Sequence, residues 1–177
     1  VIEKLKGNQA VGHVRYSTTG ETILRNVQPL FAELAAGGLA VAHNGNLTNA
    51  RELAEVLERE DRRHLNTSSD SEVLLNVLAS ELQRVGTPRV MPADILAAVS
   101  AVYRRCRGGY AAVAMVIGHG LLGFRDPNGI RPLVLGQRET PKGAEWMLAS
   151  ESVALDMLGF KLLRDVAPGE VVYIDEL

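Results

Sequence analysis

The spacing of apolar residues changes along the chain between two periods, one typical of strands and the other typical of helices. Alternating or continuous apolar stretches predict strands at 7–16, 38–43, 110–117, 121–125, 131–135, 145–149, 160–164 and 170–174. The stretch 110–117 is apolar on both sides, which predicts a strand that is buried on both faces of its sheet. Such a sheet needs a covering layer on each side.

Apolar residues spaced three and four apart predict helices between these strands. The helices are expected at 47–60, 69–84, 92–105 and near 153–158. Ser69 and Glu72 have the spacing of a capping box at the start of the second helix, and Pro92 suits the first turn of the third. Sheets covered on both faces, with helices outside, predict a layered α/β sandwich.

Composition and charge fit one domain over residues 1–177. The net charge of −2 gives no electrostatic reason to expect nucleic acid or an anionic membrane as a partner. The longest apolar run, 111–117, is far shorter than the roughly 20 residues that a membrane helix needs. Cys106 is the only cysteine, so no intrachain disulfide can form, and no signal peptide is recognisable in the first residues. We therefore expect a cytoplasmic protein.

The densest polar cluster at a strand end is His43-Asn44-Gly45-Asn46. An Asn–Gly pair most often forms a turn. The alternative is an oxyanion hole, in which the side-chain amide of Asn44 and the N–H of Gly45 both point at one developing negative oxygen. A glycine at the second position would also let a substrate approach the backbone closely.

Three other residues are candidates for binding an amino acid by its charged ends. Arg15, with the Thr18 hydroxyl beside it, could receive a carboxylate, although a surface or ion-paired arginine is an equally simple interpretation. Asp70 could receive an ammonium group, or it could simply be a favourable acid at a helix start. One Arg and one Asp on either side of an oxyanion site would hold an α-amino acid.

Several remaining features have simpler structural explanations. The segment Asp126–Leu133 predicts a tight turn that an Asp126–Arg131 pair could brace. Cys106 lies among arginines, which could lower its pKa, but no base is recognisable nearby and a structural thiol is the preferred interpretation. The four histidines lack the spacing of metal ligands, so no metal site is predicted.

Taken together, these segments resemble a known family. They occur in the order GHVRYSTTG (12–20), QP (28–29), AHNGNLTNA (42–50), NTSSDSE (66–72), GFRDPNGIRPL (123–133), ASESVALD (149–156) and RDVAPGE (164–170). The sequence resembles, over essentially its whole length, the class II glutamine amidotransferase domain of amidophosphoribosyltransferases. The resemblance implies the α-β-β-α sandwich of N-terminal-nucleophile hydrolases.

The resemblance also implies roles for single residues. Asn44 and Gly45 resemble the oxyanion pair of the family, Arg15 with Thr18 its glutamine α-carboxylate site, and Asp70 its α-ammonium site. In that family an N-terminal cysteine attacks the glutamine side-chain amide, with its own α-amine as the base. The released ammonia displaces pyrophosphate from phosphoribosyl pyrophosphate in a phosphoribosyltransferase domain, for which magnesium is expected, and 5-phosphoribosylamine is formed for purine synthesis.

The sequence departs from the family at its beginning, because the Cys-Gly-Ile start is not among the 177 residues. We therefore expect a sandwich that is incomplete at its N-terminus, no bound cofactor, and an isolated chain that is inactive. The expected partners are glutamine and the phosphoribosyltransferase domain of a parent chain, and the parent is expected to be a homo-oligomer. The alternatives are another class II amidotransferase, against which DPNGIRPL and ASESVALD argue, or a non-catalytic module that binds glutamine or docks a partner.

Overall fold

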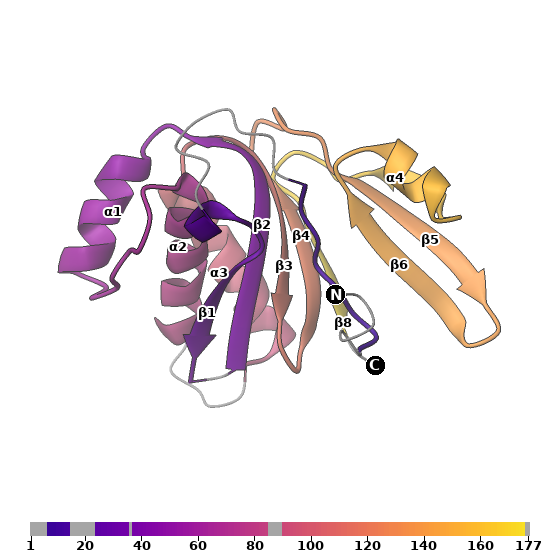
Figure 1. Cartoon of the computed structure of the whole chain (residues 1–177), viewed down its shortest axis with the longest axis horizontal. Coiled ribbons are helices and arrows are strands. Elements are labelled where there is room, and N and C mark those ends of the chain that lie inside the picture. The colour runs from indigo at the N-terminus through magenta and orange to yellow at the C-terminus, as the bar shows by residue number, and fades with distance from the viewer. Residues whose placement is uncertain (1–6, 15–23, 36, 85–89, 176–177) are drawn as a thin grey trace.

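The computed structural model describes residues 7–14, 24–35, 37–84 and 90–175 and contains two antiparallel sheets with helices on their outer sides. The strands are β1 Leu30–Leu34, β2 Gly37–Leu47, β3 Gly108–Val116, β4 Gly120–Arg125, β5 Val134–Thr140, β6 Gly143–Ala149, β7 Lys161–Asp165 and β8 Val171–Asp175. The helices are α1 Ala50–Arg59, α2 Asp70–Arg84, α3 Pro92–Arg105 and α4 Ser152–Met157, with a 3-10 turn, η2, at Leu24–Asn26. Figure 1 shows α1–α3 on one side of the larger sheet and the β5–β6 pair with α4 on the other. The predicted layered α/β sandwich is confirmed.

The larger sheet has the strand order β1-β2-β3-β4-β8, and each neighbouring pair is antiparallel. Its centre is the pair β2 and β3, which runs from Leu39 opposite Val116 to Leu47 opposite Gly108. The polar end of β2, from His43 onward, is part of this pairing. Its backbone is therefore held in the sheet and is not part of a loop.

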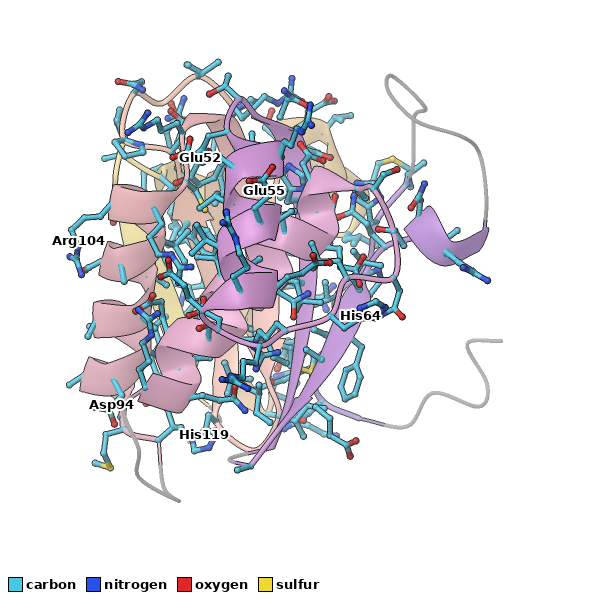
Figure 2. All side chains as sticks on the ribbon, turned by 90° about the vertical axis from the view of Figure 1, so that its left-hand side faces the viewer. Glu52, Glu55, His64, Asp94, Arg104 and His119 are labelled. Atoms are coloured by element: carbon cyan, nitrogen blue, oxygen red, sulfur yellow. The ribbon has the colours of Figure 1, made fainter. Side chains whose placement is uncertain are left out.

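The main core lies between the larger sheet and the helices α1–α3. Leu74 and Leu78 of α2 have no exposed surface, and complete burial of a leucine contributes about 1.5–3 kcal/mol. Because α2 packs against β1, β2, α1 and α3, it is buried on most sides, whereas α1 has one polar face. Figure 2 looks onto this helix layer and shows Glu52 and Glu55 of α1 on its outer side. Within the described ranges, no helix is long and apolar enough to cross a membrane.

The smaller sheet has the order β6-β5-β7 and buries residues on both faces. Side chains alternate along a strand, so Leu135 packs toward the larger sheet while its neighbour Val134 packs against Leu155 of α4. The edge strand β7 is different, because all five of its residues are exposed. The smaller sheet is therefore covered less completely than the larger one.

The first predicted strand is wrong where the structure describes it. Residues 7–14 have no regular secondary structure, and 15–16 lie outside the described residues. Val14 is 95% exposed. The apolar residues Val11 and Val14 suggested a strand, but a strand also needs a neighbouring strand to pair with.

Other boundaries shift for identifiable reasons. β2 continues to Leu47, so the predicted helix at 47–60 begins only at Ala50. The predicted capping box is also absent, because Glu72 accepts hydrogen bonds from the backbone N–H groups of Asn66 and Thr67 and not from that of Ser69. The helix still begins at Asp70, and Glu72 instead holds the loop that precedes it.

Candidate functional site

A polar cleft of 590 Å³ lies where the end of β2 meets the start of α2 and the start of α4. Its walls include Asn44, Gly45, Asp70, His43 and Arg131. A second hollow of 390 Å³ shares His43 and Asn44 with the cleft and continues between the two sheets, where its lining is mostly apolar. Three of the five predicted site residues, the adjacent Asn44 and Gly45 and the distant Asp70, therefore line one cleft.

The Asn44–Gly45 pair lies within β2, opposite Ala111 and Tyr110 of β3. The interpretation of this pair as a turn is therefore wrong. Gly45 has φ +125°, and a Cβ atom there would lie 2.1 Å from the carbonyl oxygen of Gly109. Only glycine fits this position, both because of its backbone conformation and because β3 is so close.

The side chain of Asn44 is oriented by His13. The Oδ1 atom of Asn44 lies 3.1 Å from Nε2 of His13. Since an amide oxygen can only accept a hydrogen bond, His13 donates from Nε2. The Nδ2 donors of Asn44 are then left for another acceptor, as an oxyanion site requires.

Asp70 is the first residue of α2, and its side chain is 22% exposed. Its Oδ2 atom accepts the backbone N–H of Leu47 at 3.0 Å, which joins the start of α2 to the end of β2. Its Oδ1 atom takes no hydrogen bond from the part of the chain that the structure describes. Asp70 is therefore not only a helix-start acid, because it also contacts the strand that carries Asn44 and has one carboxylate oxygen available.

His43 is buried between these two segments, at 4% exposure. Its Nδ1 atom lies 2.9 Å from the Ser71 hydroxyl, and its Nε2 atom lies 3.8 Å from Oδ2 of Asp70. Burial lowers the pKa of His43 below its ordinary value of 6.5, the nearby Asp70 acts in the opposite direction, and the charges of His13 and Arg131 act with burial. His43 is therefore neutral at pH 7.

The backbone of His43 is held from the loop before β1. Its N–H donates to Oε1 of Gln28 at 2.6 Å, and its carbonyl accepts from Nε2 of Gln28 at 3.2 Å. Gln28 is itself 8% exposed, so these two hydrogen bonds are shielded from water. The residue next to Asn44 thus has a fixed backbone and a fixed ring.

Arg15 and Thr18, the predicted carboxylate site, lie outside the described residues. Sequence reasoning missed His13, Gln28, His43 and Ser71 as parts of the site. Each lies within or next to one of the quoted motifs, and that proximity was the available signal. Their contacts, however, join residues 15 to 31 positions apart, and one sequence does not reveal such pairs.

Cys106 lies in the main core at 3% exposure, away from the cleft. Burial raises its pKa to about 12, against the smaller opposite effect of Arg105. The possibility of a lowered pKa is therefore wrong, and the structural interpretation fits. A thiol with a raised pKa is protonated at neutral pH and is a poor nucleophile.

The predicted turn at Asp126 exists, but the brace is different. Asp126 is fully buried and accepts backbone N–H groups from Tyr110, Asn128, Ile130 and Arg131. It therefore pairs with the backbone of Arg131 and not with its guanidinium, and Arg131 also lines the cleft. Among the described residues, no group of three or more His, Cys, Asp or Glu could hold a metal ion.

Comparisons with known proteins agree with this geometry. A sequence family described as a glutamine amidotransferase domain matches residues 13–157. The chain is 55% identical to an amidophosphoribosyltransferase of Pseudomonas aeruginosa and 54% identical to one of Escherichia coli, and each match covers 99% of this chain and 35% of the relative. Among solved structures, it matches a glutamine phosphoribosylpyrophosphate (PRPP) amidotransferase from B. subtilis, complexed with ADP and GMP, with a TM-score of 0.78 and 38% identity over 99% of this chain and 34% of that one. The chain thus spans about a third of the length of these relatives.

Proposed function

Because the chain belongs to the glutamine amidotransferase domain family, we propose that its cleft binds glutamine and promotes release of ammonia from the side-chain amide. Its fold is the α-β-β-α sandwich of N-terminal-nucleophile hydrolases, as in the B. subtilis PRPP amidotransferase. Within a longer protein, the ammonia would displace pyrophosphate from phosphoribosyl pyrophosphate and give 5-phosphoribosylamine for purine synthesis. The names and the 54–55% identity of the bacterial relatives support this acceptor.

In this proposal the substrate lies along the cleft. Asp70 binds the α-ammonium group through its available carboxylate oxygen, and Arg15 with Thr18 binds the α-carboxylate. The carbonyl oxygen of the side-chain amide then lies near Asn44 and Gly45, where the amide donors of Asn44 and the N–H of Gly45 stabilise the negative oxygen that forms on attack. The observation that carries the proposal is the opening of Asn44 and Asp70 into the same cleft.

The attacking thiol must come from a cysteine other than Cys106, because Cys106 is buried in the main core and has a raised pKa. We propose that an N-terminal cysteine of the parent protein supplies it, with the α-amine as base. The 177 residues alone should then bind glutamine without releasing ammonia. In isolation, the 177 residues would therefore behave as a glutamine-binding module without catalysis, which is the alternative function.

The decisive experiment uses Asn44→Ala in the full-length protein. An oxyanion donor acts on charge that exists only around the tetrahedral intermediate, so kcat with glutamine should fall about 10²–10³-fold while KM changes little. Synthesis from free ammonia does not use this site and should survive. Asn128→Ala, an exposed change in the Asp126 turn, is the matched control and should leave both activities intact. Equal loss of both activities in Asn44→Ala would mean that Asn44 supports the fold and not the reaction.

A further inference from the structure

The two halves of the proposed glutamine site come from different elements and are joined side chain to side chain. Asn44 lies on β2 and Asp70 opens α2. His43, the residue before Asn44, contacts Ser71, the residue after Asp70, at 2.9 Å. This hydrogen bond therefore links the two substrate-binding segments through their immediate neighbours.

The charge next to His43 determines which of its ring nitrogens carries the proton. Nε2 lies 3.8 Å from Oδ2 of Asp70 and has no closer hydrogen-bond partner among the described residues. A lone pair on Nε2 would face a carboxylate, whereas an N–H there would point its positive end at the carboxylate. The neutral ring therefore carries its proton on Nε2, and the Ser71 hydroxyl donates to Nδ1.

This tautomer gives each contact a direction. The Ser71 hydroxyl points at the ring, the ring N–H points at Asp70, and Asp70 accepts the backbone N–H of Leu47 further along β2. Gln28 closes the arrangement by binding both the N–H and the carbonyl of His43. The end of β2 and the start of α2 are thus connected on both sides of Asn44.

We propose that His43 is a positioning residue that sets the spacing between the oxyanion donor Asn44 and the ammonium-binding carboxylate of Asp70, with Asp70 fixing its tautomer, Ser71 its ring and Gln28 its backbone. Glutamine has a fixed length between its α-ammonium group and its side-chain amide. Holding the ammonium group therefore places the amide at the oxyanion donors only if the two protein segments keep their separation. This inference rests on the proposed function.

A residue that acts on both ends leaves a distinct kinetic signature. Loss of Asn44 should lower kcat, and loss of Asp70 should raise KM, because each acts at one end of the substrate. Loss of His43 should change both constants together, and kcat/KM for glutamine should fall about 10²-fold, the effect of a misplacement of roughly 1 Å. Synthesis from ammonia should be unchanged.

The test uses the full-length protein and the variants His43→Ala, His43→Asn and Ser71→Ala. His43→Asn keeps a polar atom near the position of Nδ1 for Ser71, so it should recover part of the activity that His43→Ala loses. Ser71→Ala removes one hydrogen bond and should lower kcat/KM for glutamine about 5–10-fold. Ser80→Ala is the matched control, because Ser80 is also a buried serine of α2 but its hydroxyl binds Asp61. It should destabilise the helix without changing glutamine kinetics.

A second arm separates positioning from general loss of stability. In an Asp70→Asn background the carboxylate that His43 orients is already gone, so Ser71→Ala should cost clearly less in kcat/KM than it does in the wild type. Additive effects, or Ser71→Ala kinetics that match those of Ser80→Ala, would overturn the proposal. If the full-length wild-type protein releases no ammonia from glutamine, the proposed function itself has failed. That result differs from a failure of the positioning role, in which the wild type is active and only the variants depart from expectation.

Discussion

The two sides of the cleft differ in how completely they are buried. The side that carries Asn44 and Asp70 rests on the main core, where Leu74 and Leu78 have no exposed surface. The side formed by the smaller sheet and α4 leaves large apolar residues at 41–82% exposure, among them Trp146, Val153, Met157, Leu158, Leu162 and Leu163. The groups proposed to bind and activate glutamine are thus held by the better-packed half.

The ion pairs of the two halves differ in the same way. In the helix layer, the Asp61 carboxylate is 3% exposed and binds both Arg84 and Arg105. On the smaller sheet, Arg138 and Glu145 pair while both remain more than 40% exposed. Water screens the Arg138–Glu145 pair more than the pairs of Asp61, so removing one partner should cost more stability at Asp61 than at Glu145.

The sharpest test of this contrast truncates one leucine in each half. Leu78→Ala removes a fully buried side chain and should lower the free energy of unfolding by about 2–5 kcal/mol. Leu163→Ala acts on a β7 side chain that is 47% exposed, and it should change the free energy of unfolding by only about 0.5 kcal/mol. Urea unfolding of the 177-residue chain measures both. Similar losses would mean that the halves are equally well packed.

The ion pairs provide a second comparison with a smaller expected effect. Asp61→Asn removes one of the two carboxylates, Asp61 and Glu81, that pair with Arg105, which is 17% exposed, and should cost about 1.5–3 kcal/mol. Glu145→Gln breaks an exposed pair and should cost no more than about 1 kcal/mol. Adding salt should weaken only the Arg138–Glu145 pair appreciably. A larger loss for Glu145→Gln than for Asp61→Asn would contradict the comparison.

The smallest expected effect is a dependence of the free energy of unfolding on pH that comes from His43 and Asp61. The pKa of His43 is below 6.5 in the folded protein, so the unfolded chain binds more protons between these two values, and stability should fall as the pH drops through that window. Burial raises the pKa of Asp61, but hydrogen bonds from Arg105 and Ser80 lower it below 3.8 overall. The contribution of Asp61 to the free energy of unfolding is therefore present above pH 3.8 and is lost as the pH falls below that value.

Two variants separate these steps in urea unfolding measured between about pH 3 and pH 8. His43→Asn should flatten the first step, for which Asp70, His13 and Arg131 are the charged or titratable groups that face His43. Asp61→Asn should remove the second step and leave the first. A first step that persists unchanged in His43→Asn would assign it to another group.

The helices and the principal residues of the candidate cleft could be predicted because local patterns specify them. Apolar residues spaced three and four apart in α2 and α3 predict buried helix faces, and Pro92 suits the first turn of a helix. Asn44, Gly45 and Asp70 lie in continuous motifs, so sequence alone brought them forward. The structure then placed all three at one cleft.

The rest depended on pairings between distant parts of the chain. Val11 and Val14 suggested a strand, but within the described residues no strand pairs with this segment. The contact between His43 and Ser71 spans 28 positions. The polar atoms of both residue types usually form hydrogen bonds with water or backbone, so the sequence did not indicate that these two side chains would meet. Asp126 was expected to bind a side chain, yet backbone N–H groups at the turn were nearer and more numerous.

The close approach of β2 and β3 determines how a saturation mutagenesis map of this domain must be interpreted. A Cβ atom at Gly45 would lie 2.1 Å from the Gly109 oxygen, and one at Gly108 would lie 2.1 Å from the Asn46 oxygen. Every replacement at these two glycines therefore fails for steric reasons, whatever the chain does with glutamine. Asn44 has no such steric restriction, since its side chain opens into the cleft. Variants at Asn44, and not variants at its glycine neighbour, will report selection for chemistry.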